Sequence, residues 1–199
     1  MTTTNAERPL DFVIIGQGLA GTTLAWQLKW RGLHGVIIDR DDGTSASKVA
    51  AGLMTPVTGK RLVPAWRLDE TWSAANDFYR RVEKETNSQF LSEPGQVRLF
   101  EDEELKAEFD RREWSEHPVE IGQPSQLVDE QSFDASFGGF ELPTARRLDV
   151  PAYLAASREV FEADGTLRIA KLDPAIDLKL EGDTVQLSKF NVTTGHLIF

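Results

Sequence analysis

The stretch FVIIGQGLAG, residues 12–21, decides the fold. Its first four residues, 12–15, are apolar and predict a short strand that is buried on both faces, as in a parallel sheet. Apolar residues at helical spacing predict a helix over residues 19–31, and residues 36–38 predict a second buried strand. Strand, helix and parallel strand within about 30 residues make a βαβ unit with a right-handed crossover.

Three glycines in this stretch match the pattern GxGxxG between the predicted strand and the predicted helix. Gly16 permits a tight turn, Gly18 lets the backbone approach a pyrophosphate, and Gly21 lets the helix lie close to the strand. The amide groups of Leu19 and Ala20 belong to the start of the helix, where the helix dipole favours an anion. The stretch therefore predicts a dinucleotide-binding turn.

Asp39 ends the second predicted strand about 20 residues after the glycines. This is the position of the carboxylate that accepts hydrogen bonds from the adenosine ribose hydroxyls, and it would repel a ribose 2′-phosphate. The alternative is an ordinary strand-to-helix turn in which Asp39 only ends a strand. Because strand, glycines, helix and acid are all in register, we favour the dinucleotide site.

The fingerprint does not separate NAD from FAD, because both cofactors contain ADP. A run of small and polar residues, 44–54, follows Asp39 and Arg40. Small side chains let backbone amides and hydroxyls lie along a cofactor that continues past the pyrophosphate. The run favours FAD, although a surface loop rich in Ser and Ala is the plain alternative. An NAD-dependent dehydrogenase would leave the run without a role.

These segments together resemble a known family. The glycine fingerprint, Asp39-Arg40 and the segment from Ser47 to Leu53 are similar to the FAD-dependent oxidoreductase superfamily of D-amino-acid oxidase, glycine oxidase and sarcosine oxidase. With Pro56-Val57-Thr58-Gly59, they also resemble bacterial proteins similar to the flavin domain of the tRNA 5-methylaminomethyl-2-thiouridine modification enzyme. The specific resemblance covers the first 60 residues.

The resemblance implies FAD as the cofactor and a set of residues that hold it. They are Gly16, Gly18, Leu19, Ala20 and Gly21 for the pyrophosphate, Asp39 and Arg40 for the ribose side, Ser47 for phosphate, Ala51, Gly52 and Leu53 for the flavin, and Leu172 for main-chain contact with adenine.

The expected fold class is α/β, a Rossmann-like FAD-binding domain with a parallel sheet plus part of an α+β substrate lobe. We expect residues 10–60 and 146–199 to form the discontinuous FAD-binding domain, and residues 61–145 to form a partial substrate lobe of helices and irregular strands. The patterns behind this division predict helices over 67–85 and 102–112 and after Pro151, and strands over 97–100, 166–172, 177–180 and 184–187.

The last apolar run, residues 196–199, is expected to be a strand in the centre of the sheet. A chain terminus beside such a strand carries an unpaired charge, which is costly in apolar surroundings. We therefore expect the fold to be truncated at Phe199, and the isolated chain to retain flavin weakly.

The composition argues against several classes of partner and site. The chain has 32 acidic and 22 basic residues, a net charge of −10, which opposes binding to nucleic acid or to anionic membranes. It has no cysteine, and its three histidines lack metal-ligand spacing, so no metal site is expected. No apolar run reaches the roughly 20 residues of a membrane span and no signal peptide is evident, so we expect a cytoplasmic protein.

The resemblance implies an FAD-dependent oxidoreductase that oxidises an amine or amino acid by hydride transfer to flavin N5, leaving an imine that water hydrolyses. Catalytic residues are not assigned by the sequence, because the cofactor carries the redox chemistry. Two alternatives stay open. One is a catalytically incomplete FAD or ADP-binding fragment that needs a missing C-terminal half or a partner. The other is the NAD-dependent dehydrogenase.

Overall fold

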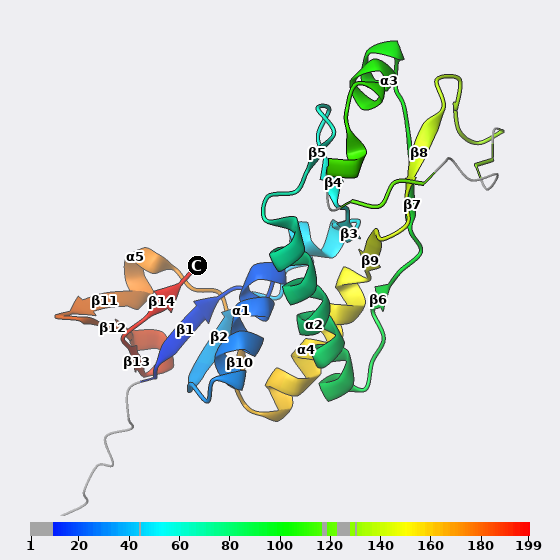
Figure 1. The fold of residues 1–199 in the computed structure, drawn as a ribbon. Helices are drawn as coiled ribbons and strands as arrows, with labels where there is room; N and C mark the ends of the chain where they lie inside the picture. Colours follow the sequence, from blue (N-terminus) through cyan, green and yellow to red (C-terminus); the bar gives the residue numbers. More distant parts are fainter. Residues whose placement is uncertain (1–9, 44, 117–118, 123–127, 130) are drawn as a thin grey trace, which may run out of the picture. The chain divides into compact units, whose positions relative to one another are not determined.

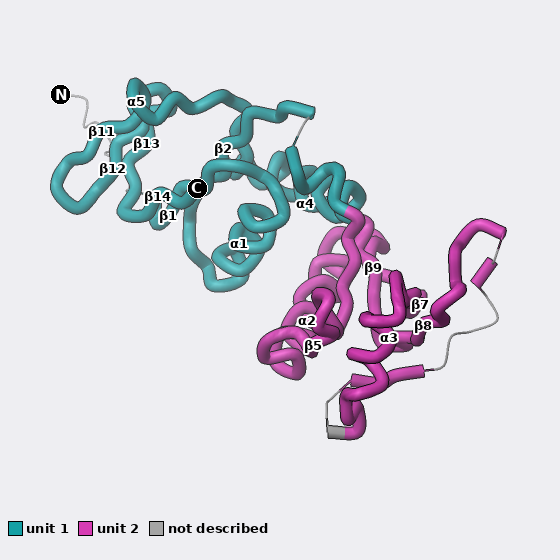
Figure 2. The backbone as a smooth tube through the Cα atoms, turned by 90° about the horizontal axis from the view of Figure 1, so that it is seen from above, with its two compact units in different colours: residues 1–50, 150–199 teal, residues 51–149 magenta. Residues whose placement is uncertain are grey.

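The computed structural model describes residues 10–43, 45–116, 119–122, 128–129 and 131–199 (Figure 1). The chain divides into two compact units (Figure 2). Unit 1 combines residues 1–50 and 150–199, and unit 2 comprises residues 51–149. Residues 51–60 and 146–149 thus belong to unit 2, although the expected FAD-binding domain included them.

Unit 1 is built on a parallel sheet of four strands, β1 (Phe12–Ile15), β2 (Gly35–Asp39), β10 (Leu167–Ile169) and β14 (Leu197–Ile198). Their spatial order is β10-β2-β1-β14, and each neighbouring pair is parallel. Read in chain order this is third, second, first and fourth, the strand order of the Rossmann fold. The predicted α/β class and its parallel sheet are confirmed.

Two helices cover one face of this sheet: α1 (Leu19–Trp30) and α4 (Val150–Ala163). Side chains alternate across a strand, so Ile14 of β1 points to the face opposite that of Val13, toward α1. The buried Trp26 joins the two helices, because its indole N–H donates to the Ser157 hydroxyl at 2.9 Å and its ring lies 5.2 Å from that of Phe161.

A small antiparallel sheet covers the other face of the parallel sheet. It consists of β11 (Leu178–Glu181), β12 (Thr184–Leu187) and β13 (Val192–Thr194). Leu187 and Val192 pack against Val13, Val36 and Ile38 in one buried cluster. The predicted hairpin is confirmed as β11 and β12, whose turn contains Gly182 at a φ of 59°. Unit 1 therefore has three layers.

Short helical segments complete unit 1. The 3-10 helix η1 (Ala46–Val49) follows β2, the helix α5 (Pro174–Asp177) follows β10, and the 3-10 helix η3 (Ser188–Phe190) separates β12 from β13.

β14 lies at the edge of the sheet that the described residues form, where it pairs with β1 alone. The expectation of a central strand over residues 196–199 is therefore wrong for this sheet. The apolar character that suggested a central strand is explained by packing instead, because Leu197 lies against the buried cluster of Val13 and Val192.

The described residues of unit 2 form two α-helices, a 3-10 helix and several short antiparallel strands. Its elements are β3 (Leu53–Met54), β4 (Val57–Thr58), β5 (Val63–Pro64), α2 (Leu68–Thr86), β6 (Leu91–Ser92), β7 (Gln96–Leu99), α3 (Glu103–Asp110), the 3-10 helix η2 (Trp114–Glu116), β8 (Gly139–Leu142) and β9 (Arg146–Leu148). The strands form a sheet β3-β9-β6 and the pairs β4-β5 and β7-β8.

The core of unit 2 is rich in aromatic side chains. Phe140 is buried and stacks on Phe109 at a centroid distance of 4.5 Å, while Phe100 lies 5.7 Å from Phe140. Such ring pairs stabilise a core beyond the apolar area that they bury. The predicted helices over 67–85 and 102–112 correspond to α2 and α3 of this unit.

A buried carboxylate connects α2 to the chain that follows it. Glu83 accepts the amide N–H groups of Phe90 and Leu91, each at 2.8 Å, and its second oxygen accepts from Arg80 at 2.9 Å. Burial by itself would raise the pKa of the Glu83 carboxyl, but the two amides and the Arg80 guanidinium outweigh it and leave the pKa below its ordinary value. Glu83 therefore holds the start of β6 in place as an anion.

The described ranges contain neither a helix that could span a membrane nor a group of side chains that could hold a metal ion. Of the helices described, none combines the length and the apolar character that crossing a bilayer requires. Within the same ranges, no group of three or more His, Asp or Glu side chains is arranged to hold a metal ion.

Candidate functional site

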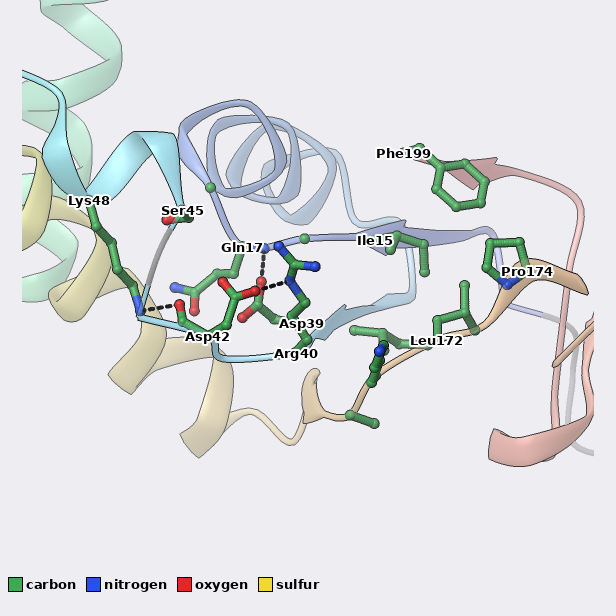
Figure 3. Close-up of a pocket in the computed structure, with 15 residues that line it drawn as sticks. Ile15, Gln17, Asp39, Arg40, Asp42, Ser45, Lys48, Leu172, Pro174 and Phe199 are labelled. Atoms are coloured by element: carbon green, nitrogen blue, oxygen red, sulfur yellow. Dashed lines mark hydrogen bonds and ion pairs between the residues drawn. The ribbon is translucent and has the colours of Figure 1, made fainter. Parts of the chain in front are cut away.

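Unit 1 has a pocket of about 400 Å³ at the carboxyl ends of β1, β2 and β10 (Figure 3). In open α/β sheets, ligands bind outside the carboxyl ends of the strands, where the strand order reverses. Here that reversal lies at β1, between β2 and β14. The pocket volume falls within the range of about 300–1,000 Å³ found for small-molecule sites.

The glycine turn forms one wall of the pocket, and its three glycines have the roles predicted for them in backbone geometry. Gly16 has a φ of +103°, which side chains rarely allow. A Cβ on Gly18 would lie 2.9 Å from the Ser47 hydroxyl, and one on Gly21 only 2.0 Å from the Gly16 carbonyl oxygen. The turn is thus closely packed against Ser47 at Gly18 and against its own first carbonyl at Gly21.

The Asp39 carboxylate lies in the pocket and is held by two backbone amides. One oxygen accepts the N–H of Gln17 at 2.6 Å, and the other accepts the N–H of Asp41 at 2.7 Å. A carboxylate oxygen has two lone pairs, so each oxygen can accept a further hydrogen bond. Asp39 is therefore a fixed pair of acceptors beside the glycine turn.

The start of α1 offers donors to an anion. Ser47 of η1 accepts the N–H of Leu19 at 3.0 Å, and the hydroxyl keeps its own hydrogen to donate. Gly18, the residue that precedes α1, makes no side-chain cap, so the first-turn amides of Ala20 and Gly21 are left for a ligand. Ser47 and the first-turn amides are not among the residues that line the pocket. They lie beside one end of it, next to Gly18, which does line it.

Charged side chains surround the same end of the pocket. Arg40 and Lys48 both line it, and each contacts Asp42: Arg40 through an ion pair, and Lys48 through a hydrogen bond to the backbone carbonyl at 3.2 Å. With Lys171, three cations line the pocket against the two carboxylates of Asp39 and Asp42, whereas acidic residues outnumber basic ones in the chain as a whole.

The opposite end of the pocket is apolar. Figure 3 shows Leu172, Pro174 and Phe199 at this end, and Ser45 and Lys48 at the other. Leu172 thus lies in the pocket, as its predicted contact with adenine requires, although it lies beyond the end of β10. An apolar end and a donor-rich end suit a ligand with a flat base and a phosphate.

Three of the residues predicted to contact the cofactor belong to unit 2 and not to unit 1. Ala51, Gly52 and Leu53 belong to unit 2, where the Gly52 carbonyl accepts the Leu148 amide at 2.9 Å and Leu53 begins β3. Their contact with a flavin stays a prediction. Thr44, the first residue of the small-residue run, lies outside the described residues.

Sequence reasoning missed several residues that shape the pocket. Lys48 belongs to the small-residue run, and its charge is the signal that could have identified it. Gln17 occupies the unspecified position between Gly16 and Gly18, where no pattern requires a particular side chain. Pro174 and Phe199 enter the pocket only through the pairing of distant strands, which a local pattern does not reveal.

A family model described as DAO, FAD dependent oxidoreductase, matches residues 11–197. The chain belongs to this family. FAD is the family's cofactor, so the question that the glycine fingerprint left open between NAD and FAD is answered for the family in favour of FAD. The match covers both compact units, including the segments 51–149 that carry no fingerprint.

Solved structures agree with the fold of this DAO family member. Glycine oxidase from Geobacillus kaustophilus superimposes with a TM-score of 0.70 at 15% identity, over 95% of this chain and 54% of that one. NikD, an unusual amino acid oxidase essential for nikkomycin biosynthesis, gives 0.68 at 20% identity, over 96% of this chain and 50% of that one. The chain spans about half the length of these structures. A search of curated proteins gives no match.

The residues at the pocket fit the ADP half of the DAO cofactor. A side chain at Gly18 would meet the Ser47 hydroxyl, so glycine lets Ser47 lie close to the glycine turn and the start of α1, where its hydroxyl can donate to a pyrophosphate. Asp39 supplies acceptors and not donors, which suits the two hydroxyls of a ribose diol.

Proposed function

We propose that the pocket of unit 1 binds the ADP half of FAD. In this proposal the pyrophosphate lies at the start of α1, where Ser47 and the first-turn amides donate to it. The ribose diol donates to Asp39, and the adenine lies toward Leu172. The observation that carries the proposal is the Asp39 carboxylate, which the Gln17 amide of the glycine turn holds at 2.6 Å.

We further propose that the complete enzyme oxidises an amine or an amino acid. When bound, FAD supplies the redox chemistry by accepting a hydride at flavin N5. The residues of unit 1 bind and orient the nucleotide, and unit 2 contributes to a substrate lobe. Support for this substrate class comes from structures of the same fold whose names specify glycine and amino acid oxidases.

The half-length match favours a second candidate function. The chain covers 50% of NikD and 54% of the glycine oxidase, so parts of those enzymes have no counterpart in it. We propose as the alternative a flavin- or ADP-binding module that becomes catalytic only with additional polypeptide. The two candidates share the pocket and differ in whether this chain alone turns over substrate.

The first prediction concerns flavin uptake. We expect the purified chain, equilibrated with added FAD, to give the visible absorption bands of a bound flavin, and to retain that flavin only weakly once the excess is removed. A Gly18→Val variant should lose these bands, because its side chain would push Ser47 away from the start of α1, where the pyrophosphate is proposed to lie. Asp164→Asn is the matched control, since Asp164 pairs with Lys29 at the surface outside this pocket.

Absence of flavin bands from this chain and from any longer version of it would refute the FAD proposal. Bleaching of the bands by amines or amino acids under anaerobic conditions would favour the oxidase. Bound flavin that no amine or amino acid bleaches would favour the module.

The second prediction concerns Asp39. Asp39→Ala should weaken the affinity for ADP and for FAD by roughly 10- to 100-fold, because it removes charge-assisted hydrogen bonds to the ribose. Titration calorimetry with ADP measures this directly and does not depend on the flavin half. An affinity equal to that of the wild-type chain would remove Asp39 from its ribose role.

A further inference from the structure

Arg158, on α4, contacts three residues that surround the candidate ribose site, although it does not line the pocket itself. Its Nε donates to the side-chain oxygen of Gln17 at 2.9 Å. Its Nη2 lies 3.1 Å from the Asp41 carboxylate and 3.7 Å from that of Asp39. The Arg158 side chain is 24% exposed and that of Asp39 19%, so their contact is partly shielded from water, whereas the Asp41 carboxylate is 41% exposed.

The side chain of Gln17, a residue of the glycine turn, bonds to α4 through both its amide nitrogen and its oxygen. Its side-chain amide donates to the Leu154 carbonyl at 3.0 Å while its side-chain oxygen accepts from Arg158. The residue is buried, and its backbone N–H donates to Asp39. A change at Arg158 therefore reaches one of the two amides that hold the Asp39 carboxylate.

Asp41 supplies the other amide. It has a φ of 52°, in the left-handed region that few residues other than glycine adopt, and its N–H donates to Asp39. The hydrogen bond and the charge of Arg158, with a smaller contribution from Lys48, hold the pKa of the Asp41 carboxyl below its ordinary value. Arg158 thus stabilises the left-handed backbone turn at Asp41 and offsets the negative charges of the Asp39 and Asp41 carboxylates.

We propose that Arg158 is a positioning residue that fixes the direction of the Asp39 carboxylate, acting through Gln17 and Asp41, and so sets the affinity of the pocket for a ribose diol. The inference rests on the proposed nucleotide site and adds a residue to it. A guanidinium suits the task because its planar fork donates in several fixed directions at once, whereas a lysine ammonium is a single point charge.

A pair of ligands tests the inference: ADP and 2′,3′-dideoxy-ADP, titrated into the full chain. The dideoxy ligand keeps the base and the phosphates but has no diol to donate to Asp39. Arg158→Met should weaken ADP binding about tenfold, the effect of one charge-assisted hydrogen bond, and leave binding of the dideoxy ligand unchanged. Arg158→Lys should lose less affinity for ADP, because the charge remains. Arg31→Met, which changes an exposed arginine directly after α1, should alter the binding of neither ligand.

A second experiment tests whether Arg158 changes the ADP affinity through Asp39. In an Asp39→Asn background, Arg158→Met should cause no further loss of ADP affinity, because the group that Arg158 orients is already impaired. Equal loss for both ligands would show general damage to the turn and overturn the inference, as would unchanged ADP binding. If Arg158→Met does not fold, as judged by circular dichroism, the same comparison on Arg158→Lys decides.

Failure of this inference is distinguishable from failure of the proposed function. If the wild-type chain binds ADP and the Arg158 variants bind both ligands as it does, only the positioning role falls. If the wild-type chain binds neither ADP nor FAD, the nucleotide site falls and the inference falls with it.

Discussion

Gly21→Ala is expected to lower the free energy of unfolding of the chain by about 3 kcal/mol and to abolish flavin uptake. The new Cβ would lie 2.0 Å from the Gly16 carbonyl oxygen and 3.2 Å from the Ile14 side chain. Neither neighbour can move easily, because Gly16 is backbone at a tight turn and Ile14 is buried in the sheet. The start of α1 must therefore move away from β1. Urea denaturation and the visible spectrum measure the two effects.

Gly195→Ala is the matched control for this experiment. Gly195 is exposed, and a Cβ there would meet no atom within 4 Å, so stability and flavin uptake should match those of the wild-type chain. A Gly21→Ala variant that unfolds at the wild-type urea concentration would contradict the packing of α1 against the glycine turn.

The second large effect is expected in unit 2. Glu83→Ala should lower the free energy of unfolding by about 3 kcal/mol, because it removes the buried carboxylate that accepts the amides of Phe90 and Leu91 and pairs with Arg80. Glu85→Ala is the control on the same helix. Glu85 forms an ion pair with Arg81 at the surface, and such pairs contribute about 1 kcal/mol at most.

The Glu83 effect should depend on pH in a defined direction. The pKa of the Glu83 carboxyl is lower in the folded chain than its ordinary value, so ionisation stabilises the fold above that ordinary value. The stabilisation is lost as the pH falls through the lowered pKa. The difference in stability between wild type and Glu83→Ala should therefore shrink in acid. A difference that grows in acid would contradict the role of Glu83 as a buried anion.

The parts of the fold that sequence predicted are those fixed by local rules. An apolar strand, GxGxxG and an acid about 20 residues later specify the βαβ unit within one short segment. The hairpin of β11 and β12 follows from Gly182 at its turn in the same way. These features depend on neighbouring residues in the chain, and the structure has them where they were expected.

The remainder depends on contacts between distant residues. Arg158 lies 141 residues from Gln17 in sequence, and nothing in the helical pattern of α4 indicates which of its polar residues faces the glycine turn. The edge position of β14 likewise follows from its pairing with β1 alone. Apolar composition could not distinguish that arrangement from a central strand.

The hydrogen bond between Gly52 and Leu148 has a consequence for folding. β2 and β10 of unit 1 must pair across the 127 intervening residues 40–166, and closing so long a loop costs about 4 kcal/mol of chain entropy. Unit 2 brings residues 52 and 148 together by its own strand pairing. Once unit 2 has folded, the connection between β2 and β10 behaves as a short tether, so we expect the inserted unit to accelerate the assembly of the sheet that it interrupts.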